Sequence, residues 1–167
     1  MSTKRAVSLA DIEAAYRAHG HHVQRRATLI LGDDNEAREV VQEVFLNLVD
    51  HPEQFAAKSA LTTWLYSATV HRCLNRLRDA RNRARLLEAR GDALPRPQPA
   101  PSPEQVVELR ALLLRLPEEL AQVAVYQLAD EMSQDEIAQT MGCSRRKVRE
   151  LLARLAQALA ADEMAQS

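Results

Sequence analysis

The chain has 167 residues, of which 46% are hydrophobic and only 4% aromatic, and its formal net charge is −1. Several long stretches place apolar residues at helical spacing and none alternates polar and apolar residues as a strand does, so the sequence predicts an all-α protein and excludes a sheet-based fold. It contains no signal peptide and no apolar run near the length of a membrane span, so we expect a cytoplasmic protein without membrane insertion.

The first predicted helix begins after Ser8 and ends near Leu31. Ser8 and Asp11 have the spacing of a capping box, in which each side chain accepts a hydrogen bond from the other residue's backbone N–H. This spacing therefore predicts where the helix begins. Its apolar positions include Leu9, Ile12, Tyr16, Val23, Ala27 and Ile30.

A turn over residues 32–35 precedes the second predicted helix, which His51 and Pro52 end. Glu39 and Glu43 are four residues apart and form one acidic face, which is an ordinary solvated surface unless a partner protein uses it. The predicted buried side consists of Ala37, Val40, Val41, Val44, Phe45, Leu48 and Val49.

A loop over Phe55–Ala60 leads to a third helix that begins near Thr62 and continues into an arginine-rich segment. The loop is small and polar and carries Lys58, and an aromatic pair begins at Trp64. Positive charge beside flat rings suits single-stranded DNA, because the charge binds phosphates and the rings stack on bases. The alternative is that Trp64 belongs to the core, which still leaves the loop free to bind DNA.

Five of the seven prolines lie between residues 91 and 105, in a segment with few apolar residues. This composition predicts an extended, semi-rigid linker. We therefore expect two small helical domains, an N-terminal helical bundle over residues 1–90 and a C-terminal domain over residues 104–167, joined by a Pro-rich linker over residues 91–103.

The C-terminal domain is predicted to contain helices near 103–115 and 117–130, followed by a helix-turn-helix. In that motif Gly142 supplies the turn and Ser144 is a good N-cap for the second helix. The exposed first turns of the second helix hold Arg145, Arg146, Lys147 and Arg149, and its buried stripe holds Val148, Leu151, Leu152, Leu155 and Leu159. The pattern is typical of a helix that enters the DNA major groove. An ordinary helical hairpin with a solvated basic face is the alternative.

Positive charge is concentrated in two places on this nearly neutral chain. Residues 72–85 carry six Arg and one Asp, and residues 144–154 carry four Arg, one Lys and one Glu. Two local basic surfaces predict two weak DNA contacts. The protein would bind DNA tightly only when both surfaces contact it together, or when a larger partner already holds the DNA.

No sequence motif supports an enzyme. The chain has no Gly-rich phosphate loop, no nucleophile elbow and no cysteine pair with metal spacing. The cluster His19, His21 and His22 lacks a second pair of ligands, so we expect no metal and no cofactor. Cys73 and Cys143 are expected to be buried small hydrophobic residues.

Together these segments resemble an extracytoplasmic-function (ECF) sigma factor, the two-domain minimal class of the sigma-70 family. The resemblance covers about residues 10–85 and 104–160 and depends on the order of GDDNEAREVVQEVF, TWLY, LPEEL and SQDEIAQTMGCSRRKVRELLARL. It implies a subunit that binds core RNA polymerase, recognises the −35 and −10 promoter elements and aids DNA melting. It also implies control by an anti-sigma factor, which could hold the protein at the inner membrane.

The resemblance implies roles for individual residues. The clamp of the largest polymerase subunit would contact Glu39, Val41, Gln42, Glu43, Phe45 and Leu46. The −10 element and the melted junction would contact Lys58, Ser59, Ala60, Leu61, Thr62, Thr63, Trp64, His71, Arg72 and Arg76, with Arg78 as a further phosphate contact. The −35 element would contact Ser144, Arg145, Arg146, Lys147 and Arg149.

Some positions depart from the family pattern. His71 stands where the family usually has Asn, and Val49 where it commonly has Trp. The helix over 117–131 carries acidic residues and no Lys or Arg, which weakens phosphate contact. This acidity favours a second hypothesis, a sigma-like decoy that occupies an anti-sigma factor without initiating transcription. A stand-alone helix-turn-helix repressor leaves the first domain unexplained.

Overall fold

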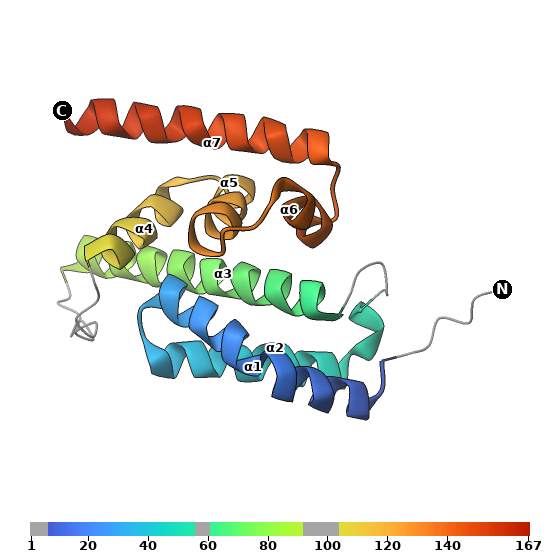
Figure 1. Cartoon of the computed structure of the whole chain (residues 1–167). Helices are drawn as coiled ribbons and strands as arrows, with labels where there is room; N and C mark the ends of the chain where they lie inside the picture. Colours follow the sequence, from blue (N-terminus) through green and yellow to red (C-terminus); the bar gives the residue numbers. More distant parts are fainter. Residues whose placement is uncertain (1–6, 56–60, 92–103) are drawn as a thin grey trace.

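The computed structural model describes residues 7–55, 61–91 and 104–167, and in these residues the protein is all-α, as predicted. The helices form layers (Figure 1), with α3 between the α1–α2 pair on one side and α4, α5 and α6 on the other, and α7 outermost. The helices are α1 (Leu9–Leu31), α2 (Asp34–Asp50), α3 (Leu61–Arg90), α4 (Glu104–Arg115), α5 (Glu118–Ala124), α6 (Gln134–Met141) and α7 (Arg145–Gln166). A 3-10 turn, η1 (Pro52–Gln54), follows α2, and a π-helical turn, η2 (Val125–Ala129), extends α5.

The helix starts follow from local side-chain caps. The Ser8 hydroxyl accepts a hydrogen bond from the backbone N–H of Asp11, and the Asp11 carboxylate accepts one from the Ser8 N–H, which confirms the predicted capping box. Asp33 caps α2 through backbone N–H groups of its first turn. The Ser144 hydroxyl accepts from the backbone N–H of Lys147 and fixes the start of α7, as predicted.

One hydrophobic core runs through both predicted domains. Buried apolar residues of α1, α2 and α3 are continuous with those of α4 to α7. The buried stripe of α7 is confirmed at Val148, Leu151 and Leu155. The prediction for α2 is wrong at Val49, which is exposed, and the apolar position Tyr16 of α1 is exposed as well. Both side chains lie on a face that no other helix of the described chain covers.

The C-terminal end of α1 lies against α4. Gly32 caps α1 with φ 73°, in the left-handed region that favours glycine. A Cβ added at Gly32 would lie 1.9 Å from the guanidinium carbon of Arg110 on α4. Glycine is therefore favoured at this position by its backbone conformation, whereas the Arg110 side chain could move aside for a Cβ.

A buried ion pair joins the two halves of the chain. The Arg26 Nε of α1 donates to Asp130 Oδ1, directly after η2, at 3.0 Å, and the two side chains are 8% and 14% exposed. The Arg26 guanidinium also lies 4.0 Å from the ring centroid of Tyr66 on α3. Burial raises the pKa of Asp130, and the Arg26 charge opposes that effect.

Removal of the Asp130 carboxylate is expected to destabilise the protein strongly. Asp130→Ala leaves the Arg26 charge buried without its partner, which costs roughly 3 kcal/mol or more in the free energy of unfolding. Asp130→Asn keeps a hydrogen-bond acceptor and is the matched control with a smaller loss. Urea unfolding followed by circular dichroism measures both; equal stability of Asp130→Ala and wild type would contradict the account.

Candidate polymerase and nucleic-acid interfaces

The helix-turn-helix presents its basic residues on one exposed face. Ser144 lies at the N-cap of α7, and Arg145, Arg146 and Arg149 are exposed in the first two turns, with Lys147 half-buried beside them. The opposite side of α7 packs into the core through Val148, Leu151 and Leu155. The structure therefore brings together all five residues that the sequence assigned to the −35 element.

Acidic side chains border this basic face. Glu119 Oε2 lies 4.0 Å from the Lys147 Nζ and 4.0 Å from an Nη of Arg154. Asp135 Oδ1 lies 3.5 Å from an Nη of Arg145. Such exposed pairs contribute little to stability, but they place negative charge where a phosphate would bind.

The residues assigned to the −10 element are only partly described. Lys58, Ser59 and Ala60 lie outside the described residues, whereas Leu61, Thr62, Thr63 and Trp64 form the first turn of α3 and are half-buried. Thr62 Oγ1 lies 3.2 Å from His19 Nε2, which ties this turn to α1. Trp64 packs against the core and also lines the cleft between α2 and α3. It is therefore partly a core residue, as the alternative interpretation predicted, and partly a residue of the cleft surface.

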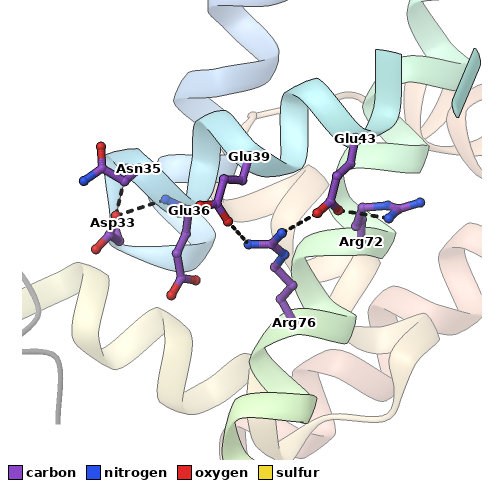
Figure 2. Close-up of polar contacts among 7 residues, drawn as sticks. All are labelled: Asp33, Asn35, Glu36, Glu39, Glu43, Arg72 and Arg76. Carbon is purple, nitrogen blue, oxygen red and sulfur yellow. Dashed lines mark hydrogen bonds and ion pairs between the residues drawn. The ribbon is translucent and has the colours of Figure 1, made fainter. Parts of the chain in front are cut away.

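The arginines of α3 form ion pairs with the acidic face of α2 (Figure 2). Arg76 donates to Glu39 Oε2 at 3.1 Å and to Glu43 Oε1 at 2.6 Å. Arg72 donates to the other Glu43 oxygen, Oε2, at 2.9 Å. Burial alone would lower the pKa of Arg76, but the hydrogen bonds and charges of Glu39 and Glu43 outweigh it and raise that pKa.

The remaining predicted DNA contacts of α3, His71 and Arg78, lie against a carboxylate from the other half of the chain. His71 Nδ1 lies 2.6 Å from Glu118 Oε1, and Arg78 Nη1 lies 3.2 Å from Glu118 Oε2. Glu118 is the first residue of α5. Sequence reasoning missed these contacts, because no local spacing connects residues 40 positions apart.

The predicted polymerase surface of α2 divides into buried and exposed residues. Val41 and Phe45 are only 4% and 6% exposed and belong to the core. Glu39 and Gln42 are exposed and Glu43 is half-buried. Leu46 is 61% exposed, so it is the apolar side chain of the predicted set that a partner can reach directly.

Exposed apolar residues of α1 and α2 accompany Leu46 and were missed in the sequence. We define the α1–α2 apolar surface as Leu9, Tyr16, Leu46 and Val49, all exposed. A groove lined in part by Leu9, Tyr16 and Val49 lies between the two helices, and the Tyr16 ring packs edge-on against Phe45 with centroids 5.0 Å apart. Helical periodicity marked these residues as apolar but could not show that no other helix covers them.

Other side chains with reactive or ligating atoms give no further site. In the described residues no group of three His, Cys, Asp or Glu side chains is placed to hold a metal ion. Cys73 is buried, as predicted, and its burial raises the pKa of the thiol to about 12, while Cys143 is half-buried. No described helix has both the length and the apolar character needed to cross a membrane.

Comparison with known proteins gives the family. The model of the family "Sigma-70 region 2" matches residues 15–83, and that of "Sigma-70, region 4" matches residues 107–159. The chain therefore belongs to the sigma-70 family, as an ECF sigma factor, which confirms the resemblance seen in the sequence. Members of this family are regulatory DNA-binding proteins that act with RNA polymerase.

Solved structures share the fold. One is CnrH in complex with the cytosolic domain of CnrY, with a TM-score of 0.60 and 20% identity over 96% of this chain and 92% of that chain. Another is the sigma factor RpoE in complex with the anti-sigma factor NepR from Bartonella quintana, with a TM-score of 0.55 and 16% identity over 90% and 95% of the two chains. At these identities the likeness shows the fold alone.

Proposed function

We propose that this sigma factor binds core RNA polymerase, directs it to specific promoters through their −35 and −10 elements, and aids DNA melting. The observation that carries the proposal is the exposed basic face at the start of α7 in a region-4 helix-turn-helix. The N-terminal residues of such a recognition helix reach base edges in the major groove. Ser144, Arg145, Arg146, Lys147 and Arg149 are the proposed −35 contacts.

The −10 element is assigned to the start of α3 and the residues before it. A base flipped out of the duplex costs a few kcal/mol in lost stacking, which a pocket and backbone contacts offset. Residues 58–63 are proposed to form that pocket and Trp64 to support it from the cleft between α2 and α3. On α3, Arg72, Arg76 and Arg78 are proposed to bind phosphates near the melted junction, and His71 is a further proposed DNA contact.

The polymerase clamp is assigned to α2 and extended onto α1. Glu39, Gln42 and Glu43 supply polar contacts, and Leu46 supplies an apolar one as part of the α1–α2 apolar surface. Val41 and Phe45 support this face from the core. An exposed apolar patch bordered by charge is typical of a protein-binding surface.

The two units must separate to reach both promoter elements. The −35 and −10 elements are about 25 base pairs apart, roughly 85 Å along B-form DNA. A compact chain of this length has a radius of gyration of only about 15 Å. We propose that the Arg26–Asp130 interface opens on the polymerase, with residues 91–103 as a linker that can span roughly 45 Å.

Glu119 is expected to limit affinity for −35 DNA. Glu119→Gln removes negative charge near Lys147 and Arg154 and should raise the affinity of the holoenzyme for a −35-containing duplex about threefold, with a smaller gain at high salt. Glu163→Gln, an exposed change near the far end of α7, is the matched control. Fluorescence anisotropy at two salt concentrations measures the effect, and unchanged affinity would exclude Glu119 from the DNA surface.

An anti-sigma factor is the proposed regulator. The two solved structures compared above are complexes: CnrH with the cytosolic domain of CnrY, and RpoE with the anti-sigma factor NepR. We propose that a comparable partner controls this chain in the cytoplasm, and holds it at the inner membrane where that partner is a membrane protein.

Co-purification with core RNA polymerase separates the proposal from the decoy. A sigma factor should elute with the core enzyme as a stoichiometric complex on gel filtration, and that complex should retain promoter DNA. The acidic residues around α5 favour the decoy hypothesis, which requires binding to an anti-sigma factor without binding to core polymerase. Absence of the core complex would therefore refute the sigma activity and support the decoy.

A further inference from the structure

The proposed DNA contacts of α3 are neutralised inside the protein. Each of these cationic side chains has a carboxylate partner, supplied by α2 or by α5. The cations are Arg72, Arg76 and Arg78, and the carboxylates are Glu39, Glu43 and Glu118, the last of which also contacts His71. The free protein therefore offers phosphates much less positive charge on α3 than the sequence suggests.

The α2 part of this network leaves little capacity for other partners. Glu43 uses one carboxylate oxygen for Arg72 and the other for Arg76, and Arg76 uses one terminal nitrogen for each glutamate (Figure 2). The Arg76 side chain is only 26% exposed. A cation of the polymerase therefore competes with two arginines at Glu43, which is 40% exposed, and a phosphate competes with two glutamates at Arg76.

We propose that Arg72 and Arg76 mask the polymerase-binding carboxylate Glu43 in the free protein, that Arg76 competes with polymerase for one oxygen of the more exposed Glu39, and that polymerase and promoter DNA each release the surface used by the other. The proposal rests on the proposed function, because it takes Glu39 and Glu43 as polymerase contacts. It gives Arg72 and Arg76 a second role besides phosphate binding.

The exchange couples the two binding events. When basic groups of the polymerase bind Glu39 and Glu43, Arg72 and Arg76 become available to phosphates. Coupling between sites is reciprocal, so DNA must raise affinity for polymerase by the same factor. Exposed and half-exposed ion pairs are weak, so we expect that factor to be about 5-fold for the network.

The direction in which one double substitution changes the affinity for core polymerase tests the proposal. The double variant Arg72→Gln/Arg76→Gln should bind core polymerase about 5-fold more tightly than wild type when no DNA is present, because its carboxylates are unmasked. The matched control is Arg83→Gln/Arg85→Gln, which removes the same charge from two exposed arginines of α3 that pair with no carboxylate among the described residues. Its affinity should stay near that of wild type.

Two outcomes overturn the proposal. Unchanged affinity of Arg72→Gln/Arg76→Gln would mean that the arginines do not mask the carboxylates, and weaker binding would mean that they hold the carboxylates in place for polymerase. A separate variant shows whether α2 contacts polymerase at all. If it does not, Glu43→Lys would leave the affinity for core polymerase unchanged.

A second readout uses the free protein without polymerase. Glu39→Gln/Glu43→Gln should raise affinity for a labelled single-stranded DNA oligonucleotide about 5-fold and steepen its salt dependence by one to two charges, because two arginines are released. Glu13→Gln/Glu36→Gln removes the same charge from exposed positions of α1 and α2 and is the control. If both double variants gained the same affinity for the oligonucleotide, the gain would come from net charge alone, and release of the arginines would be refuted.

Discussion

The double variant Arg145→Ala/Arg149→Ala is expected to lose transcription from promoters that depend on a −35 element, while it keeps its affinity for core polymerase. Both side chains are exposed at the start of α7, far from α2 in the layered arrangement (Figure 1). A bidentate arginine–guanine contact contributes about 1–3 kcal/mol of discrimination, so loss of two arginines should reduce promoter-specific binding roughly 100-fold or more.

Run-off transcription and a core-binding assay on the same preparations measure this separation of roles. Arg154→Ala, further along α7, is the control and should keep most of its promoter activity. If the double variant lost core binding and transcription together, with its helical content intact, the assignment of α7 to DNA alone would be wrong.

The variant Leu46→Asp is expected to abolish transcription from every promoter, because it removes core binding. Leu46 is an exposed apolar residue of α2, and burial of a leucine side chain against a partner contributes about 2–3 kcal/mol. A buried aspartate without a partner adds a further penalty, so affinity for core polymerase should fall at least 100-fold. Glu43→Lys should weaken binding in the same direction.

Val107→Asp is the matched control for Leu46→Asp. Val107 is an exposed apolar residue of α4, on the other side of α3, and its substitution should leave core binding unchanged. Thermal unfolding of both variants shows whether they are folded. A folded Leu46→Asp protein that binds core polymerase like wild type would remove α2 from the polymerase interface.

Helix boundaries were predictable because they depend on local chemistry. Ser8, Asp33 and Ser144 cap their helices through atoms two or three residues away, and Gly32 and Gly142 end helices in the left-handed conformation. Such signals need no knowledge of the tertiary fold. The predicted helix starts therefore agree with α1, α3, α6 and α7 to within a residue or two, whereas α7 continues to Gln166, well past the predicted stripe that ends at Leu159.

The packing of the two halves was not predictable in the same way. The proline-rich segment suggested two separate domains, but Arg26 and Asp130, 104 residues apart, form a buried pair between them. Exposure of Tyr16 and Val49 likewise depends on which helix face remains uncovered. The π-helical turn after α5 had no sequence signal that separates it from an ordinary helix.

The exposure of basic side chains at the start of α7 was predictable from the sequence, but the ion pairs of the α3 arginines were not. The structure leaves Arg145, Arg146 and Arg149 exposed, as the helix-turn-helix pattern indicates. By contrast, Arg72 and Arg76 were assigned to DNA as if they had no internal partners. Their pairing with Glu39 and Glu43 joins two helices that sequence spacing cannot align.

Run-off transcription tests the central claim most directly. Purified core RNA polymerase, this protein and fragmented genomic DNA from its source are combined, and the transcripts are mapped. The account predicts discrete transcripts that require the protein and whose upstream regions share one −35 and one −10 sequence. A protein that binds core polymerase but yields no discrete transcript above the core-alone background would contradict promoter-directed initiation.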